Sequence, residues 1–545
     1  MADHFLLAAP RINDERSTEC LRHLFVTDPE KDKQRIESDR DNLLRDCYSW
    51  ILSDSKFKAW QEADQDQLLW IRGDPGKGKT MLMIGLVHEI TAHLQSRPGQ
   101  GILTYFFCQS NLVTLNNAIC ILRGLIWMIV GQDQSLMRHV LVEYDKFGER
   151  LFEGPNAFFA LRSIFVNILQ DPALAMVYVL VDAIDECSTG LDKFLNLVVQ
   201  GTSGLPSRVK WILTSRHRPD IAQMLGQTAV QHRIDLEENQ NPIAEAVTTF
   251  IEYKMNLLSQ DRFYDLDLRN HVGQILREKA GNTFLWVALV CHELASAESW
   301  EAEAIVEELP SGLEPLYDHM LSQIKNLRKS QYEVCEGILR SMALVFRPVN
   351  LKELQAITFL PPRLASNING MRSTIELCGS FLTTQEGEIS FIHQSAKDYL
   401  VTGSGQLIFD GDQAEEHAKI VTQSIQTMSN ILKRDLLDLK HPGYLISHLP
   451  ANETLAGMSY AVCFWGHHLL EYIGGSGNPK NHQDLLLVVH SFLQSHLLHW
   501  IEALSLLGKI SDGLSIITQL KSCIKACYLS ILKKIKYLQP LGFCE

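Results

Sequence analysis

The chain has 545 residues, of which 46% are hydrophobic and 21% are charged, values that are ordinary for a globular protein with buried cores. Its formal net charge is −14 and no basic stripe offsets it, which argues against nucleic acid as a main partner. The 12 cysteines include no C-x-x-C pair, so neither a zinc ribbon nor a disulfide framework is indicated. No signal peptide or membrane-length apolar run occurs in the sequence, and we expect a cytoplasmic protein without stable membrane insertion.

Apolar runs predict an α/β region in the first half of the chain. Residues 1–67 are polar and charge-rich, and we expect a helical pre-core segment there, with one amphipathic helix from about Arg35 to Leu52. Residues 68–238 alternate apolar strands with helical stretches, which predicts a parallel sheet with helices on both faces. The strand candidates are Leu68–Ile71, Ile102–Cys108, Val177–Val181, Val209–Leu213 and His232–Leu236.

The rest of the chain is predicted to be mainly helical, with a helical domain at 239–310. Ser380–Thr384 and Glu388–His393 flank a turn at Glu386-Gly387, and a helix follows at Gln394–Val401. This order predicts a winged-helix domain at 311–405. We expect a second, all-helical domain at 406–545, ending in an amphipathic segment near Ile516–Leu538.

Residues Gly73 to Thr80 read Gly-Asp-Pro-Gly-Lys-Gly-Lys-Thr, a complete phosphate-loop motif between a predicted strand and a predicted helix. Glycines there let backbone N–H groups turn toward phosphate oxygens at the positive end of a helix. Lys79 would reach the β- and γ-phosphates, and the Thr80 hydroxyl would bind Mg²⁺. The expected nucleotide-binding residues are Gly73, Pro75, Gly76, Lys77, Gly78, Lys79, Thr80 and Met81.

Acidic residues follow the third predicted strand, Val177–Val181. Asp182 would lie at the carboxyl end of that strand, where an open α/β sheet binds its ligand, and is expected to hold Mg²⁺ directly or through water. Asp185 or Glu186 would orient the attacking water as the catalytic residue. The alternative is that these acids form a solvated loop at the strand end.

A basic cluster follows the fourth predicted strand, Val209–Leu213. A guanidinium at that edge of the sheet can detect a γ-phosphate through a charge-assisted contact. Arg216 is preferred to Arg218 because it is nearer the strand. The alternative is a surface arginine that pairs with a carboxylate. The order of phosphate loop, acidic strand and basic strand is that of an ATPase core, and no metal other than nucleotide-bound Mg²⁺ is expected.

With these motifs the chain resembles the NACHT ATPases of filamentous fungi, which include vegetative-incompatibility proteins and belong to the STAND class of NTPases. The resemblance runs from about Cys20 to about Gly513. Besides the phosphate loop and the acidic strand with Ala183, it rests on Arg35-Ile36-Glu37, Tyr105-Phe106-Phe107-Cys108, Thr214-Ser215-Arg216, Gly281-Asn282-Thr283-Phe284-Leu285-Trp286, Leu377-Cys378-Gly379-Ser380-Phe381-Leu382, Ile392-His393-Gln394-Ser395-Ala396-Lys397-Asp398 and Trp500-Ile501-Glu502-Ala503-Leu504.

The resemblance implies a nucleotide-binding domain, a helical domain, a winged helix and a second helical domain, in that order. It also implies that His393, where the hairpin meets its following helix, touches the β-phosphate of ADP and holds a closed state together. The alternative for His393 is a histidine that caps a helix or fills the core.

The function implied is an ATP/ADP-dependent switch of NOD-like receptor type, closed with ADP and self-associating with ATP, with slow ATP hydrolysis as a reset. A role in fungal non-self recognition or programmed cell death follows from the same resemblance. We expect the chain to lack effector and sensor modules of its own and to act with partner proteins, as a partial gene product, a stand-alone regulator or a subunit. The alternatives are a continuously cycling AAA+-like ATPase and a nucleotide-binding scaffold without hydrolysis.

Overall fold

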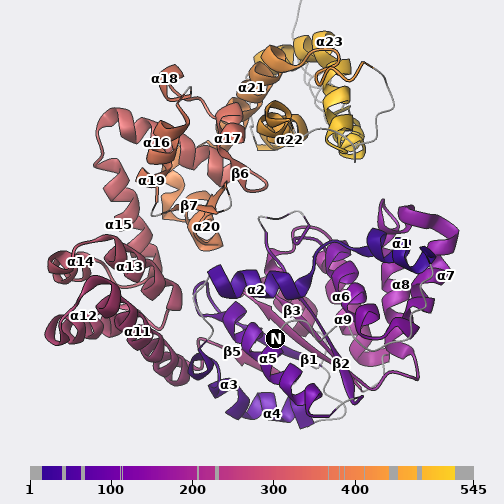
Figure 1. Ribbon diagram of the computed structural model, residues 1–545, viewed down its shortest axis with the longest axis vertical. Coiled ribbons are helices and arrows are strands. Elements are labelled where there is room, and N and C mark those ends of the chain that lie inside the picture. Colours follow the sequence, from indigo (N-terminus) through magenta and orange to yellow (C-terminus); the bar gives the residue numbers. More distant parts are fainter. Residues whose placement is uncertain are drawn as a thin grey trace, which may run out of the picture. The chain divides into compact units, whose positions relative to one another are not determined.

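The computed structural model (Figure 1) describes most of the chain. The described residues are 15–39, 44–62, 68–97, 99–110, 112, 114–204, 208–226, 232–365, 367–379, 381–385, 387–409, 412–440, 452–475 and 482–521. Most of the amphipathic segment predicted near Ile516–Leu538 therefore lies outside the described residues. Within them, no helix is both long and apolar enough to cross a membrane.

The chain forms two compact units, residues Met1–Leu316 and Tyr317–Glu545. The first contains the predicted pre-core segment, the sheet and the first group of helices. The second contains the hairpin and the later helices. The finer division at residues 67, 238, 310 and 405 stays a prediction.

The first unit is built on a parallel five-stranded sheet in the order β2-β3-β4-β1-β5. Its strands are β1 (Leu68–Arg72), β2 (Gly101–Phe107), β3 (Met176–Asp182), β4 (Val209–Ser215) and β5 (His232–Asp235). All five predicted strands are confirmed, and so is the parallel α/β fold. The order places β4 between β1 and β3, so the basic strand lies between the phosphate loop and the acidic strand.

Helices cover both faces of this sheet. In β1 to β4 the even- and odd-numbered residues point to opposite faces, and both sets are mostly apolar and buried, which explains why these strands read as apolar runs. In β5 the Arg233 side chain is exposed. One face packs with α6 (Ala118–Gln132), α8 (Ala157–Gln170) and α9 (Leu191–Gly204) in a single large core. The other face is covered by α5 (Lys79–Gln95), which contacts β2, β3 and β4.

The segment before the sheet differs from its prediction. It forms α1 (Glu15–Leu24), α2 (Pro29–Asp39), η1 (Arg45–Cys47), α3 (Trp50–Ser53) and α4 (Ser55–Glu62). The single helix expected from Arg35 to Leu52 is therefore wrong. Tertiary contacts decide the local structure here, because the Tyr48 ring packs against Gly85 of α5 and its hydroxyl lies 3.2 Å from the Glu89 carboxylate.

Short helices complete the α/β part of this unit: η2 (Gln134–Leu136), α7 (Met137–Phe147), η3 (Gly148–Phe152), η4 (Ile184–Glu186) and α10 (Pro219–Gly226). The helical part that follows has α11 (Gln240–Arg262), α12 (Leu266–Lys279), α13 (Phe284–Ser296), η5 (Ser299–Glu301) and α14 (Ala302–Glu308). Its centre is the fully buried Trp286 of α13, whose indole N–H donates to the Pro310 carbonyl at 3.1 Å.

The helix α15 (Leu313–Lys325) leads into the second unit, which continues with α16 (Lys329–Leu344), β6 (Val349–Asn350), α17 (Leu351–Ile357), α18 (Pro362–Ala365), α19 (Ile368–Leu377), β7 (Leu382–Gln385), β8 (Glu388–Phe391), α20 (Gln394–Thr402), η6 (Ser404–Phe409), α21 (Gln413–Ile431), α22 (Glu453–Gly475) and α23 (His482–Leu506). The predicted hairpin is confirmed as β7–β8. Its sheet has the order β6-β8-β7, and the sequence did not reveal β6 because only two residues form it.

Candidate functional site

The phosphate loop joins the end of β1 to the start of α5. Gly76 and Gly78 have φ values of +79° and +81°, which residues with a Cβ atom seldom adopt. A Cβ atom on Gly73 would approach the Leu236 side chain to 2.9 Å, and one on Gly78 would approach the Phe284 ring to 3.0 Å. The motif thus needs glycine at 76 and 78 for both backbone angle and space, and at 73 for space.

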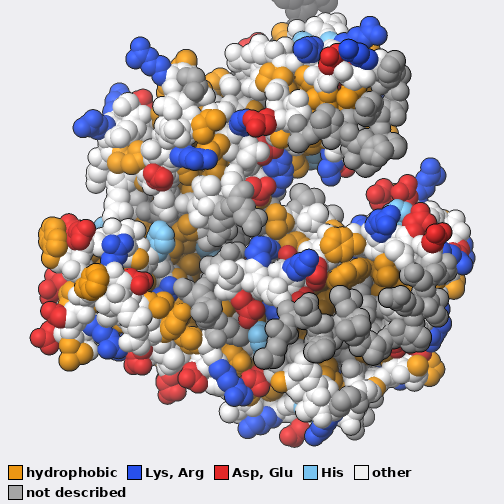
Figure 2. Space-filling view, viewed as in Figure 1, with side chains coloured by type: hydrophobic (Ala, Val, Ile, Leu, Met, Phe, Trp, Pro, Cys, Tyr) orange, Lys and Arg blue, Asp and Glu red, His pale blue; other side chains and the backbone are white. Residues whose placement is uncertain are grey.

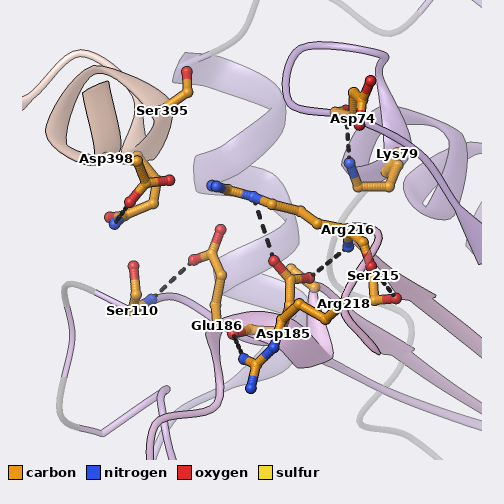
Figure 3. Close-up of polar contacts among 12 residues, drawn as sticks. Asp74, Lys79, Ser110, Asp185, Glu186, Ser215, Arg216, Arg218, Ser395 and Asp398 are labelled. Atoms are coloured by element: carbon orange, nitrogen blue, oxygen red, sulfur yellow. Dashed lines mark hydrogen bonds and ion pairs between the residues drawn. The ribbon is translucent and has the colours of Figure 1, made fainter. Parts of the chain in front are cut away.

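Lys79, the first residue of α5, lies over the loop that precedes it (Figure 3). Its Nζ donates to the carbonyl oxygens of Gly73 at 2.5 Å and Asp74 at 2.9 Å. Burial lowers the pKa of Lys79, while the negative charge of Asp185, and less strongly that of Asp182, acts in the opposite direction. A buried ammonium beside backbone carbonyls is well placed to exchange them for phosphate oxygens.

The other predicted residues of the loop are half-buried: Pro75, Lys77, Thr80 and Met81. The structure places Thr80 in the first turn of α5, directly after Lys79. Lys77 turns away from that helix, and its Nζ donates to the carbonyl oxygens of Gly281 at 3.1 Å and Asn282 at 3.0 Å.

The turn before α13 thus belongs to the surroundings of the loop, which the loop motif alone could not show. Leu285 N–H donates to the Gly76 carbonyl at 3.3 Å, and a Cβ atom on Gly76 would approach the Thr283 side chain to 2.8 Å. The signal for this turn in the sequence is the Gly281–Trp286 motif.

Asp182 ends β3 and is 1% exposed. The Thr214 hydroxyl of β4 donates to Asp182 Oδ1 at 2.5 Å and accepts from the Ala183 N–H at 2.7 Å. Ala183 has the left-handed φ of 50°, so this hydroxyl fixes both the carboxylate and the turn after it. Thr214 was missed as a site residue, although a threonine in an apolar strand was a visible signal.

Asp185 and Glu186 diverge from the short helix η4 (Figure 3). Asp185 turns toward the end of β4, where its carboxylate accepts from Arg216 N–H at 3.0 Å and lies 3.3 Å from Arg216 Nε. Glu186 turns the other way and accepts from the Ser110 N–H after β2 at 2.9 Å.

The two candidate arginines both reach Asp185, by different atoms. Arg216 pairs with its carboxylate, whereas Arg218 donates to its backbone carbonyl at 2.9 Å and pairs with Asp220. Pairing with a carboxylate is the alternative to a γ-phosphate contact for Arg216, and the structure shows such a pair with Asp185. Asp185 is almost completely buried in this pair, since its side chain is 5% exposed.

A further carboxylate, which sequence reasoning missed, borders the loop. Glu237, just after β5, accepts from the Asp74 N–H at 2.7 Å. Burial raises the pKa of Glu237, and its hydrogen bond with Asp235 acts in the same direction. Asp235, the last residue of β5, in turn pairs with Arg72 at the end of β1. Asp235 and Glu237 thus hold the chain on either side of Gly73.

His393 belongs to the second unit, where it precedes α20. Its Nδ1 accepts from the Ser395 N–H at 3.1 Å and lies 2.7 Å from the Ser395 hydroxyl, so the imidazole caps the helix. Helix capping was the alternative reading of this residue. The predicted contact between His393 and a nucleotide phosphate stays a prediction.

Comparison with known proteins agrees with the resemblance seen in the motifs. A family model described as "Nephrocystin 3, N-terminal" matches residues 46–216. The vegetative incompatibility protein HET-E-1 of Podospora anserina is 38% identical over 525 residues, which make up 93% of this chain and 38% of that protein. The chain therefore spans well under half the length of this relative.

Among solved structures, the ORC2 protein of Aeropyrum pernix matches with a TM-score of 0.34 and 12% identity, over 67% of this chain and 93% of that chain. Cdc6p from Pyrobaculum aerophilum matches with a TM-score of 0.29 and 13% identity, over 66% of this chain and 93% of that chain. The sequence match is much the stronger: this chain is a relative of the fungal vegetative-incompatibility NACHT proteins.

Proposed function

We propose that this chain is a switch of the STAND class, in which ADP favours a closed form and ATP an open, self-associating form. The observation that supports this most is the ion pair between Arg216 and Asp185 at the sheet edge that also carries Lys79 and Asp182. A γ-phosphate at that edge would compete with Asp185 for the guanidinium. ADP has no γ-phosphate, so ATP would weaken the ion pair between Arg216 and Asp185 and ADP would leave it intact.

The energetic requirement for such a switch is moderate. To change a population from 1:99 to 99:1, the two nucleotides must differ by roughly 5.5 kcal/mol in their preference for the two forms. Hydrogen bonds to charged groups contribute about 1.5–3 kcal/mol each. A γ-phosphate contact with Arg216 and a β-phosphate contact with His393 would together reach much of that difference.

Magnesium fits the donors that the sequence and fold supply. Thr80 offers a hydroxyl at the start of α5, and Asp182 offers a buried carboxylate oriented by Thr214. Such hard oxygen ligands are those that Mg²⁺ prefers beside nucleotide phosphates, where the bound ion neutralises negative charge. We therefore assign Thr80 and Asp182 as the residues that hold it.

Hydrolysis would be slow and would return the switch to its ADP form. Asp185 and Glu186 are the candidates for orienting water. Asp185 is already engaged by Arg216, so its release would accompany the binding of a γ-phosphate. Glu186 is oriented by the Ser110 N–H from the loop after β2.

Similarity to HET-E-1 supports a role in fungal incompatibility, exerted in the cytoplasm with effector or sensor partners. Because this chain matches 38% of that relative, the biological role is carried over as part of the proposal.

The test is to purify the chain without added nucleotide, denature it and identify what it released by anion-exchange chromatography. Near-stoichiometric ADP is expected, and Lys79→Ala is expected to retain none. His393→Ala should weaken ADP more than ATP in titration calorimetry. A chain that purifies empty and binds ATP and ADP equally would contradict the switch, and undiminished binding by Lys79→Ala would contradict the site itself.

A further inference from the structure

Three large apolar side chains project from the helical part of the first unit. Phe263 at the end of α11 is 87% exposed, Leu266 at the start of α12 is 66% exposed, and Trp300 in η5 is 78% exposed. Contiguous exposed apolar groups with a polar border are typical of interaction sites in soluble proteins.

Leu266 and Trp300 lie at the same end of two helices that run in the same direction. His271 Nε2 of α12 is 2.9 Å from Glu303 Oε1 of α14, and farther along both helices Lys279 Nζ donates to the Leu309 carbonyl at 2.8 Å. Leu266 lies a little over one turn before His271, and Trp300 about one turn before Glu303.

A contact of the preceding residue, Arg262, places Phe263 near Trp300. The Arg262 guanidinium donates to the backbone carbonyl of Ala295, which joins the end of α11 to the end of α13. The chain from Ala295 leads directly into η5 and Trp300. We call Phe263, Leu266 and Trp300 the apolar triad.

The backbone presents two of these rings in fixed positions. Phe263 has a left-handed conformation (φ 56°, ψ 38°), which favours glycine or asparagine and is uncommon for an aromatic residue. Trp300 lies in a turn closed by Glu301 N–H donating to the Glu298 carbonyl at 3.0 Å and by Glu298 N–H donating to Glu301 Oε2 at 3.4 Å. Neither burial nor local conformation explains an aromatic side chain at Phe263.

The border of the triad is acidic. The carboxylates near this end of the helices are Asp261, Asp265, Asp267, Glu298, Glu301 and Glu303. Of the basic residues, Arg262 is engaged by the Ala295 carbonyl, Arg269 lies in the first turns of α12, and Arg277 and Lys279 lie in its last turn. Figure 2 shows hydrophobic side chains among acidic ones over α12 and α14, at the left edge of the view.

We propose that the apolar triad and its acidic border bind a basic amphipathic peptide segment of a partner protein. Apolar side chains of the peptide would pack on Phe263 and Leu266, and a lysine or arginine would lie over the Trp300 ring while others meet the carboxylates. Aromatic anchors of this kind dominate binding energy at protein interfaces. The acidic border disfavours nucleic acid and anionic membrane surfaces. This inference does not depend on nucleotide switching.

The experiment measures fluorescence anisotropy of a labelled helical peptide of lysine and leucine, roughly five turns long, with the full chain. A glutamate and leucine peptide with the same apolar face is the charge control. The test variants are Trp300→Ala and Phe263→Asn. The second suits the left-handed backbone, so its folding should be preserved. Phe147→Ala removes a ring that is 56% exposed at the end of α7 and serves as the matched control.

We expect the basic peptide to bind, the acidic peptide not to bind, and each triad variant to weaken binding by about tenfold or more. Asp267→Lys should weaken binding of the basic peptide relative to the parent, and more strongly at low salt. Phe147→Ala should bind the peptide like the parent. Equal binding by the triad variants and the parent would overturn the proposal. Equal binding of the basic and acidic peptides would also overturn it. If the parent chain self-associates and Trp300→Ala abolishes that self-association, the surface binds a second copy of the chain, and the proposal is wrong.

Discussion

Lys77 Nζ of the phosphate loop lies 3.0 Å from the carbonyl oxygen of Asn282, in the turn that leads into α13. The same ammonium bonds the Gly281 carbonyl at 3.1 Å, and Leu285 N–H bonds the Gly76 carbonyl in return. The loop and the start of α13 therefore form one hydrogen-bonded structure. A ligand that moves the loop backbone would therefore strain the bonds to the start of α13.

Lys77→Met tests this connection, because it keeps most of the aliphatic side chain and removes the donors. We expect the free energy of unfolding of the first unit to fall by about 1–2 kcal/mol, and the amides at the start of α13 to exchange faster with solvent. Hydrogen exchange read by mass spectrometry measures this. Lys56→Met is the control, since Lys56 makes only a long contact of 3.9 Å with Glu238. Unchanged exchange at the start of α13 in Lys77→Met would show that the tie has no mechanical role.

Gly78→Ala should abolish nucleotide binding, whereas Gly99→Ala should not. Both glycines have a φ of +81°, so both substitutions strain the backbone by about 1 kcal/mol. Only at Gly78 would the new methyl also approach the Phe284 ring, at 3.0 Å, while Gly99 has open space around it. Titration calorimetry with ATP separates the effects. Normal ATP binding by Gly78→Ala would show that the loop adapts to the methyl group.

Burial and periodicity explain which parts of this fold could be predicted from the sequence. Strands β1 to β4 are largely buried on both faces, so each is a short, mainly apolar run, whereas β5 has a single apolar residue, Ile234, and an exposed Arg233. The single helix from Arg35 to Leu52 was wrong because Tyr48 packs on Gly85, a contact between residues that are distant in the chain. Local patterns carry no information about such contacts.

The candidate site shows the same limit. Its phosphate loop and acidic strand are contiguous motifs, so both can be found in the sequence. The contributions of Thr214, Glu237 and the turn at Asn282 depend on which strands and helices become neighbours. In particular, Thr214 reaches Asp182 only because β4 lies beside β3.

Asp185→Asn should strengthen ATP binding more than ADP binding and slow turnover. The substitution removes a negative charge beside the predicted phosphate position and releases the Arg216 guanidinium for the γ-phosphate. We expect ATP affinity to rise by about tenfold, which corresponds to roughly 1.4 kcal/mol, and ADP affinity to rise less. Asp220→Asn is the control, because Asp220 pairs with the neighbouring Arg218 at the surface. Lower or unchanged ATP affinity in Asp185→Asn would show that Asp185 does not compete with nucleotide for Arg216.

Two buried histidines give the second unit an acid-sensitive core. His417 Nδ1 lies 2.7 Å from His468 Nδ1, and His468 Nε2 lies 2.8 Å from the Tyr460 hydroxyl. That hydroxyl also accepts from Phe346 N–H at 3.0 Å. The Nδ1–Nδ1 bond cannot form between two protonated imidazoles, because both Nδ1 atoms would then be donors.

Acid should therefore unfold the second unit. Burial, helped by the charge of Lys397, lowers the pKa of His417 to about 4 from 6.5, and burial lowers the pKa of His468 in the same direction. Above pH 6.5, the pKa of histidine in the unfolded chain, the full contribution to stability is present. It is lost as the pH falls from 6.5 toward 4, because the unfolded chain takes up the proton before the folded chain does. The loss from His417 alone is at most about 3 kcal/mol. Urea unfolding followed at about pH 7.5 and about pH 5 should show it, and His417→Asn should reduce the difference between the two conditions. An equal difference in parent and variant would assign the acid sensitivity to other groups.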